Sequence, residues 1–379
     1  MKKNVKSVPE IRFPGFTDLW ELRKVGEFAV ESCEKGHNGQ EALKLTVKLH
    51  TKGVCKMEEK GQGSDNTQYY VRHAGQLIYG KQNFFNGAIG IVPQSLDGYE
   101  STKDVPAFDI DDNVCVEWFY QYIARPGIYK SQEVNCTGTG SKRFHVNAFF
   151  DMNIPIPLIE EQKKISDYFK AIDNLITLQE QRCQVLKRLK QCMLQKMFPK
   201  DGSDTPEIRF PGFTGSWEQR KLGDVVEIGS GMDYKHLNEG NIPVYGTGGY
   251  MLSVDKALSE NKDAIGIGRK GTIDKPYILK APFWTVDTLF YCIPKDNYDL
   301  DFTNCLFQNI DWKKKDESTG VPSLSKVIIN SVETFIPSYA EQKKIGEYFL
   351  PVDHLITLQE RKCKVLRELK KCMLQKMFV

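Results

Sequence analysis

The sequence of 379 residues lacks the segments that mark membrane and secreted proteins. It contains no apolar run long enough to span a bilayer, and Met1–Asn4 leads into polar residues and not into an apolar signal segment. The composition, 40% hydrophobic and 27% charged, is that of a soluble globular protein. We expect a cytoplasmic protein without a membrane partner, and its length suggests two or three domains.

Motifs for catalysis and metal binding are also missing. The ten cysteines form no C-x-x-C pair, so we interpret them as packing residues in a reducing compartment. The six histidines have no spacing typical of metal ligands, and no G-x-S-x-G motif occurs. Gly75–Gln82 has the glycines and lysine of a phosphate-binding loop but lacks the Ser or Thr that follows the lysine. The sequence therefore predicts no catalytic residue, no metal site and no cofactor in this chain.

The main feature that is present is a repeat. Glu161–Phe198 aligns without a gap with Glu341–Phe378, and 26 of the 38 aligned residues are identical. Apolar residues in each copy alternate at steps of four and three, which predicts a seam that packs one long helix against another. The residues expected to pair in this seam are Ile165, Phe169, Ile172, Ile176 and Leu186 in the first copy, and Ile345, Phe349, Ile356 and Leu366 in the second. Polar positions recur as well, which favours two paired helices over an ordinary helical hairpin in a core.

The predicted helices begin just after prolines. Pro157 and Pro337 are each followed by acidic residues within four positions, which is typical of a first helical turn. The copies differ where Pro351 replaces Ala171, and a proline inside a helical pattern breaks or kinks the helix. We therefore expect the straight part of the second helix to begin at Asp353.

A shorter repeat stands before each globular part. Pro9–Thr17 returns as Pro206–Thr214, and Trp20 returns as Trp217. The Pro-Gly pair inside this short motif predicts a tight turn that leaves the flanking aromatic residues free to dock on one surface. The chain is therefore ordered as short motif, globular part and helix, repeated once, with a linker at Pro199–Thr205.

The two globular parts do not resemble each other in sequence, but both are predicted to be rich in strands. The expected strands include residues 76–79 and 87–92 in the first part, and residues 264–267 and 285–290 in the second. A duplicated frame would thus hold two diverged inserts.

The net charge of +3 is divided unevenly along the chain. Residues 160–198 carry 8 basic against 5 acidic residues, and residues 341–379 carry 9 against 5. Residues 28–159 carry 13 against 15, and residues 225–340 carry 12 against 15. The globular parts are slightly acidic, so they would not hold nucleic acid by overall charge alone.

In this order the motifs resemble the specificity subunit of Type I restriction–modification systems. The resemblance rests on the duplicated Phe-Pro-Gly-Phe-Thr-x-x-Trp-Glu, the duplicated Glu-Gln-Lys-Lys-Ile and the helix endings Leu194–Phe198 and Leu374–Phe378. Ile242–Gly246, Ile267–Thr272 and Phe283–Thr288 are also similar to target-recognition domains of that family. The resemblance covers nearly the whole chain, and the order of the motifs makes it specific.

The resemblance implies an α+β fold with two globular, strand-rich target-recognition domains, each followed by a long helix. The two helices would pair as an antiparallel coiled coil with internal pseudo-twofold symmetry, acting as a spacer and as a platform for two modification subunits. The domains would be residues 1–159 and 201–340, and the helical spacers residues 160–200 and 341–379.

The resemblance also implies that each domain reads one half of a split target in double-stranded DNA. The modification subunits would methylate adenine with S-adenosylmethionine, and restriction subunits would complete a nuclease that uses ATP and Mg. This chain would then choose the DNA sequence without performing the chemistry. A scaffold that assembles protein partners without reading DNA is the alternative. A self-sufficient methyltransferase is disfavoured, because no Asn-Pro-Pro-Tyr/Phe motif is present.

Candidate DNA-contact residues follow from residue type and position. Arg, Lys, Asn and Gln read base edges in the major groove, and loops beside strands commonly carry binding residues. The candidates are Lys81, Gln82, Asn83, Lys142 and Arg143 in the first domain, and Arg269, Lys270, Thr272 and Lys314 in the second.

Overall fold

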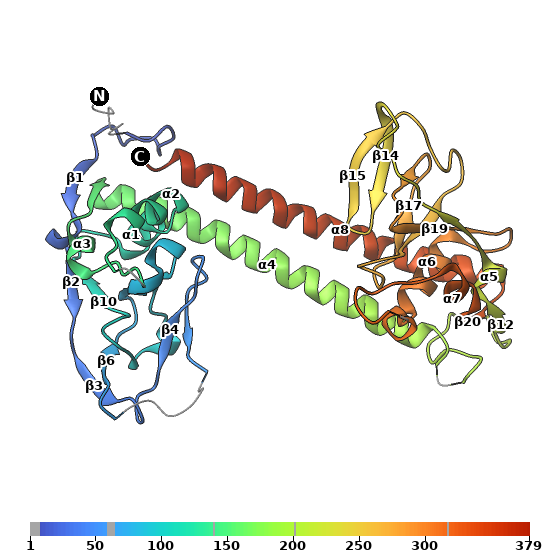
Figure 1. Ribbon diagram of the computed structural model, residues 1–379, viewed down its shortest axis with the longest axis horizontal. Coiled ribbons are helices and arrows are strands. Elements are labelled where there is room, and N and C mark those ends of the chain that lie inside the picture. Colours follow the sequence, from blue (N-terminus) through green and yellow to red (C-terminus); the bar gives the residue numbers. More distant parts are fainter. Residues whose placement is uncertain (1–7, 59–64, 139–140, 201, 317) are drawn as a thin grey trace. The chain divides into compact units, whose positions relative to one another are not determined.

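The computed structural model divides into two compact units, residues 1–178 with 363–379, and residues 179–362. Each unit combines one strand-rich domain with a segment of both long helices, α4 (Ile159–Met197) and α8 (Tyr339–Lys376) (Figure 1). The described residues are 8–58, 65–138, 141–200, 202–316 and 318–379.

The first domain is built on a four-stranded antiparallel sheet in the order β2-β10-β7-β8. A three-stranded sheet, β3-β6-β9, and two ribbons, β1-β11 and β4-β5, complete its strands. The strands are β1 (Glu21–Lys24), β2 (Ala29–Ser32), β3 (Lys35–Asn38), β4 (Leu45–Val47), β5 (Val54–Lys56), β6 (Gln68–Arg72), β7 (Leu77–Tyr79), β8 (Ile89–Ile91), β9 (Tyr99–Ser101), β10 (Ala107–Ile110) and β11 (Asn153–Ile156). The predicted strands at 76–79 and 87–92 are confirmed as β7 and β8.

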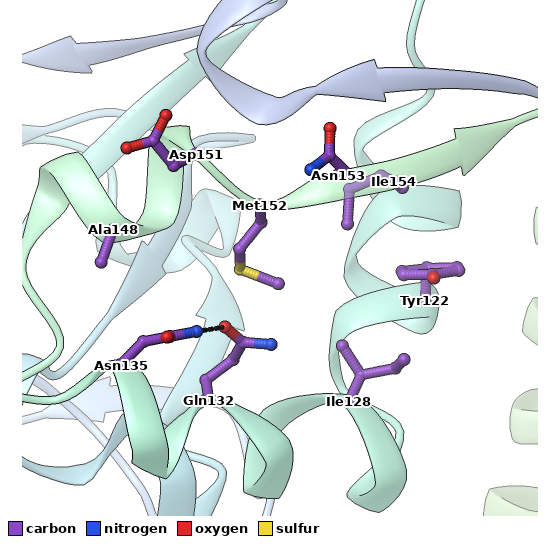
Figure 2. Close-up of a pocket in the computed structure, with 9 residues that line it drawn as sticks. All are labelled: Tyr122, Ile128, Gln132, Asn135, Ala148, Asp151, Met152, Asn153 and Ile154. Carbon is purple, nitrogen blue, oxygen red and sulfur yellow. Dashed lines mark hydrogen bonds between the residues drawn. The ribbon is translucent and has the colours of Figure 1, made fainter. Parts of the chain in front are cut away.

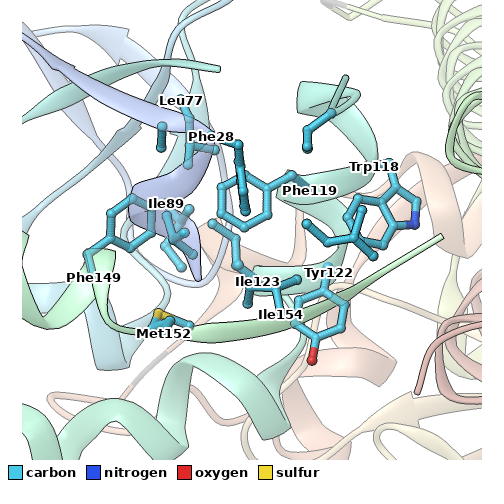
Figure 3. Close-up of a cluster of buried hydrophobic side chains, with 14 of the residues drawn as sticks. Phe28, Leu77, Ile89, Trp118, Phe119, Tyr122, Ile123, Phe149, Met152 and Ile154 are labelled. Atoms are coloured by element: carbon cyan, nitrogen blue, oxygen red, sulfur yellow. The ribbon is translucent and has the colours of Figure 1, made fainter. Parts of the chain in front are cut away.

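Short helices pack on this sheet and contribute to the hydrophobic core of the first domain. They are α1 (Val116–Ile123), α2 (Pro126–Tyr129) and α3 (Val146–Phe150), with the 3₁₀ helices η1 (Val25–Glu27), η2 (Lys81–Asn86), η3 (Gln94–Leu96) and η4 (Lys130–Asn135). Helix α1 places Trp118, Phe119, Tyr122 and Ile123 on one face, as the helical period requires, and all four are buried. Figure 3 shows these side chains gathered with Phe28, and the Phe28 and Phe119 rings meet edge to face at 5.2 Å.

The second domain repeats this plan. Its main sheet has the order β13-β19-β16-β17, beside a three-stranded sheet, β15-β14-β18, and a ribbon, β12-β20. The elements are β12 (Glu218–Lys221), α5 (Leu222–Val225), β13 (Val226–Ser230), β14 (Glu239–Gly246), β15 (Gly249–Val254), β16 (Ala264–Gly268), β17 (Tyr277–Leu279), β18 (Trp284–Thr285), β19 (Leu289–Pro294), α6 (Leu300–Asn309), η5 (Trp312–Lys315), α7 (Lys326–Ser331) and β20 (Glu333–Ile336). The predicted strand at 264–267 is confirmed as β16.

The prediction of one strand at residues 285–290 is wrong. Thr285 ends β18, which pairs with β14, whereas Leu289 begins β19 in the main sheet. The backbone turns between them, and the Leu289 amide donates to the Val286 carbonyl at 2.9 Å. Strand propensity identified residues that favour extended backbone, but it did not detect the turn that moves the chain from one sheet to the other.

The main sheets of the two domains are equivalent strand for strand, although their sequences differ. Strands β2, β10, β7 and β8 correspond in order to β13, β19, β16 and β17, and the ribbon β1-β11 corresponds to β12-β20. The two inserts therefore diverged in sequence while they kept one topology.

The two long helices pair antiparallel in both units. In the first unit the Phe169 and Phe378 rings stack at 6.0 Å, and Lys370 donates to Asp173 at 2.6 Å. In the second unit Lys187 pairs with Glu360 at 2.6 Å, and Lys190 donates to Asp353 and to Gln308. Residue numbers thus rise along α4 as they fall along α8. Of the predicted seam residues, Ile165, Phe169, Ile172, Ile345 and Phe349 are buried, and Ile176, Leu186, Ile356 and Leu366 are half-buried.

Pro351 does not break the second helix, and a straight part that begins at Asp353 stays a prediction. Helix α8 begins at Tyr339 and continues through Pro351 without interruption. A proline inside a helix removes one backbone hydrogen bond, at a cost of about 3 kcal/mol. Ile345 and Phe349, which precede the proline, are buried in the second core, so their packing offsets that cost.

A buried ion pair explains why Glu161 and Glu341 recur. The Arg12 guanidinium donates to both Glu161 oxygens, at 2.8 Å and 2.6 Å, and Arg209 binds Glu341 in the same way at 2.7 Å. Both glutamates are buried, and the hydrogen bond to Glu161 raises the pKa of Arg12. The short motif before each domain is thereby tied to the first turn of the long helix that follows it.

The next residue of the helix, a glutamine in both copies, ties the helix to the domain. Gln162 accepts from the Cys115 amide at 2.8 Å and donates to the Pro157 carbonyl at 2.9 Å. Gln342 accepts from the Asp299 amide at 3.0 Å and donates to the Pro337 carbonyl at 3.1 Å. The Glu-Gln pair therefore belongs to the frame, as its recurrence indicated.

The aromatic residues of the short motif dock as predicted. Gly15 and Gly212, with φ of 96° and 92°, make the turns that a side chain would strain. Phe13 then contacts Tyr168 at 6.0 Å, and Phe210 contacts Tyr348 at 5.9 Å.

The tryptophan that follows each short motif binds the end of a long helix. Trp20 lies 6.3 Å from Phe378, which follows α8, and Trp217 lies 5.7 Å from Phe198, which follows α4. Each domain thus lies at the start of one long helix and packs against the end of the other.

We expect Glu161→Gln to lower the free energy of unfolding by about 3–5 kcal/mol, because the substitution leaves Arg12 without its buried counter-charge. Chemical denaturation followed by circular dichroism measures this change. The exposed neighbour Glu160 supplies the control, since Glu160→Gln should cost less than about 0.5 kcal/mol. Equal losses in the two variants would contradict a stabilising role for the ion pair.

The two lysine–aspartate pairs across the helices should differ in strength. Lys190 and Asp353 are 9% and 35% exposed, whereas Lys370 and Asp173 are 30% and 50% exposed. Asp353→Asn should therefore cost about 1–3 kcal/mol, because it leaves Lys190 buried and charged, and Asp173→Asn less than about 1 kcal/mol. The same denaturation experiment compares them, and a larger loss for Asp173→Asn would disprove this reasoning.

Candidate nucleic-acid interface

One basic pocket lies at the same place in each domain, where the central strand of the main sheet ends. Strand β7 leads through Gly80 to Lys81, and β16 ends at Gly268 before Arg269. The Lys81 carbonyl accepts from the Phe144 amide at 2.8 Å, and the Arg269 carbonyl accepts from the Leu324 amide at 2.9 Å. These matching bonds make Lys81 and Arg269 structurally equivalent.

The first basic pocket has a volume of about 290 Å³. It lies between the end of β2, the start of η2 and the start of α3. Its lining residues are Glu31, Ser32, Cys33, Tyr70, Arg72, Lys81, Lys103, His145, Val146 and Asn147.

The second basic pocket has a volume of about 510 Å³. Its lining residues are Ser230, Arg269, Lys270, Phe290, Ser323, Leu324, Ser325 and Lys326. The turn that carries Arg269 and Lys270 requires glycine before it, because a Cβ on Gly268 would lie 2.0 Å from the Thr272 carbonyl oxygen. Close backbone approach thus explains Gly268, and the positive φ of 91° explains Gly271.

Each pocket places two cations against one aromatic ring. In the first pocket Arg72 and Lys103 lie 5.6 Å and 5.8 Å from the centre of the Tyr70 ring. In the second, Arg269 and Lys326 lie 5.9 Å and 6.0 Å from the centre of the Phe290 ring. The ring faces attract the cations, so positive charge is held together in a domain whose overall charge is slightly negative. Such a pocket suits an anionic ligand.

Three of the predicted DNA-contact residues line these pockets, namely Lys81, Arg269 and Lys270. Gln82 is exposed on η2 beside Lys81, and Asn83 accepts from Asn86 at 3.1 Å within the same helix. These two remain predictions for DNA contact at the edge of the first pocket.

The other predicted contact residues lie outside the two sets of lining residues. Lys142 pairs with Glu133 at 2.6 Å, Arg143 with Asp104 at 3.4 Å, and Lys314 with Asp311 at 3.2 Å. Thr272 is half-buried after the Arg269 turn. The three ion pairs are exposed and contribute little to stability, so their cations could exchange partners at low cost.

Sequence analysis missed most of the pocket residues. Arg72, Lys103, His145 and Asn147 were not predicted in the first pocket, nor were Ser230, Ser323, Ser325 and Lys326 in the second. A signal did exist for part of this set. The offset of 180 that relates the long helices also relates β11 to β20 and Phe144 to Leu324 (324 minus 144), so extending the repeat upstream would have matched His145 with Ser325.

A hollow of about 490 Å³ in the first domain has a different character. Figure 2 shows Gln132 and Asn135 facing Asp151 and Asn153 across it, with Met152 between them. The nine residues shown to line it include no lysine or arginine, and Asp151 is paired with Lys24 at 2.9 Å. Its chemistry does not suit a polyanion, so we do not assign it to nucleic acid.

The described part of the chain shows neither a membrane-spanning helix nor a metal-binding cluster. No helix there is both long enough and apolar enough to cross a bilayer. No group of three or more His, Cys, Asp or Glu side chains in that part could hold a metal ion.

Comparison with known proteins agrees with this architecture. The family model for the Type I restriction modification DNA specificity domain matches residues 107–188 and 215–368. The specificity subunit of the Type I restriction enzyme MjaVIII from Methanocaldococcus jannaschii is 22% identical over 344 residues, which cover 79% of this chain and 74% of that protein.

Two solved structures share the fold across almost the whole chain. The S subunit of a Type I restriction–modification system from M. genitalium has a TM-score of 0.68 at 15% identity, covering 98% of this chain and 99% of the other. A chain from a study of complex assembly and conformational transition in the type I R-M system has a TM-score of 0.53 at 18% identity, with 97% and 99% coverage. Because the family model matches more than half of the sequence, the chain belongs to the Type I restriction–modification DNA specificity family, the non-catalytic subunits that recognise DNA sequence for the restriction–modification complex.

Proposed function

We propose that this chain reads a bipartite target in double-stranded DNA, one half with each domain, and directs partner subunits to it. The observation that carries this proposal is the pair of equivalent basic pockets, one in each unit. Both follow the central strand of the same sheet, but different side chains line them. A cation-lined pocket at the same place in each domain suits two domains that each contact the DNA of one half-site.

Exposed apolar side chains on the long helices support partner-binding surfaces there. Leu175, Leu178, Val365 and Leu369 are exposed in the first unit, and Val185, Leu189, Leu355 and Leu358 are exposed in the second. Through the offset of 180, each of these two apolar patches holds the repeat equivalents of the other (355 minus 175, 365 minus 185). Exposed apolar patches on helices mark protein interaction sites. Two equal patches support two copies of one partner.

We assign the two patches to two modification subunits, which would methylate adenine with S-adenosylmethionine. Restriction subunits would add the ATP- and Mg-dependent nuclease, and the complex would act in the cytoplasm. A scaffold without DNA contact would need the patches but not the basic pockets. The pockets therefore favour a subunit that reads DNA.

Exchanging residues 28–159 for those of a related specificity protein should change one half of the methylated target and leave the other half intact. The expectation follows because the first domain has its own hydrophobic core and its own basic pocket. Sequencing of methylated adenines in cells that carry the chain and its partners measures the target. Exchange of residues 225–340 is the matched control and should change the opposite half. If either exchange altered both halves, the domains would not be independent readers.

Loss of one apolar patch should remove one modification subunit from the complex. Leu178→Glu combined with Val365→Glu places charges on the first patch, and buried charges without partners are costly at an interface. Native mass spectrometry should then show one bound modification subunit where the unaltered chain binds two. Gln181→Glu, an exposed change on α4, is the control and should keep both. Two subunits bound to the double variant would contradict the assignment.

A further inference from the structure

Arg72 is a buried cation whose hydrogen bonds all go to neutral groups. The residue is 1% exposed. Its Nε donates to the Ser101 hydroxyl at 2.7 Å, and its terminal nitrogens donate to the carbonyls of Ser32 at 2.8 Å and Val105 at 3.3 Å. Among the described residues, no carboxylate is one of its bonding partners, unlike those of Arg12 and Arg209. Burial lowers the pKa of Arg72, since its charge is only partly compensated.

The first basic pocket adds further positive charge around Arg72. Lys103 stands against the same Tyr70 ring, and Lys81 lines the pocket and is half-buried. Glu31 is the single acidic residue among the described lining residues, and its charge raises the pKa of Arg72 against the larger lowering by burial. Three permanent cations therefore face one carboxylate. Like charges that line one pocket repel one another, and an anion bound there would offset that repulsion.

The second basic pocket is built differently. Arg269 and Lys270 are exposed there, and Lys326 donates to the Ile228 carbonyl at 2.8 Å. None of the lining residues described in that pocket is a buried cation like Arg72. The two pockets share a position in the fold, but among the described lining residues only the first pocket has a buried cation.

We propose that the first basic pocket binds a single phosphate of the DNA backbone, with Lys81 and Lys103 as direct donors and Arg72 supplying fixed charge behind them. This inference rests on the proposed function and adds that different residues make the backbone contact and recognise the bases. A phosphate contact sets the register of the first domain on the duplex and carries no base information. Discrimination between bases then falls to residues outside this pocket.

Lys103→Gln tests the proposal in the full chain assembled with its modification subunits. Binding is measured at several salt concentrations, on DNA that carries the target and on DNA that lacks it. Each neutralised phosphate contributes about 0.9 to the slope of log affinity against log salt, so the variant should lose about that amount. Affinity should fall by the same factor on both DNAs. Arg72→Met should act in the same direction if it folds, and Lys130→Gln, an exposed lysine outside the pocket, should keep the original slope.

A second measurement distinguishes DNA phosphate from the free anion. Inorganic phosphate should raise the melting temperature of the unaltered chain above that in chloride of equal ionic strength, and Lys103→Gln should abolish the rise. If phosphate stabilises the chain but the salt slope of Lys103→Gln is unchanged, the pocket holds a free anion and the proposal is overturned. A changed base preference in Lys103→Gln would also overturn it, because it indicates a base contact. If the unaltered complex shows no preference for any DNA sequence, the proposed function fails instead.

Discussion

The buried arginine–glutamate pair at the start of each long helix is the constraint on which the rest of the frame depends. Glu161 and Glu341 are almost completely removed from water, which is costly for a carboxylate unless a cation binds it closely. Arg12 and Arg209 meet that requirement through two hydrogen bonds each. Each short motif is thereby fixed to the helix that follows its domain, and the neighbouring glutamine fixes the helix to the domain itself.

With the frame fixed at these points, the domains can differ without loss of the fold. Their main sheets keep the same strand order, and the same ribbon joins each short motif to its helix. The small sheets differ between the domains, and different residues line the two basic pockets. In the first domain the polar lining residues can change without disturbing Trp118 and Phe119 in the core, whereas Phe290 and Leu324 belong both to the second pocket and to the second core.

Charge is arranged locally and not over whole domains. Each domain is slightly acidic, yet each gathers several cations in one pocket around an aromatic ring. A surface without broad positive charge binds DNA weakly by charge alone. Partner subunits would then supply many of the contacts to the DNA phosphates. The exposed leucines and valines on both helices support the proposed sites for those partners.

The sequence by itself determined the duplicated frame, the helical seam, several strands and the family, because those features are periodic or repeated along the chain. It also predicted DNA contacts for Lys81, Arg269 and Lys270, which stand beside glycines at strand ends and line the basic pockets. The tertiary structure alone decided that Arg72, Lys103 and His145 join Lys81, because residues far apart in sequence meet only when the sheets form. Only the structure showed that α8 continues through Pro351 and that residues 285–290 divide between two sheets. In both cases long-range packing and pairing outweighed the local preference of the backbone.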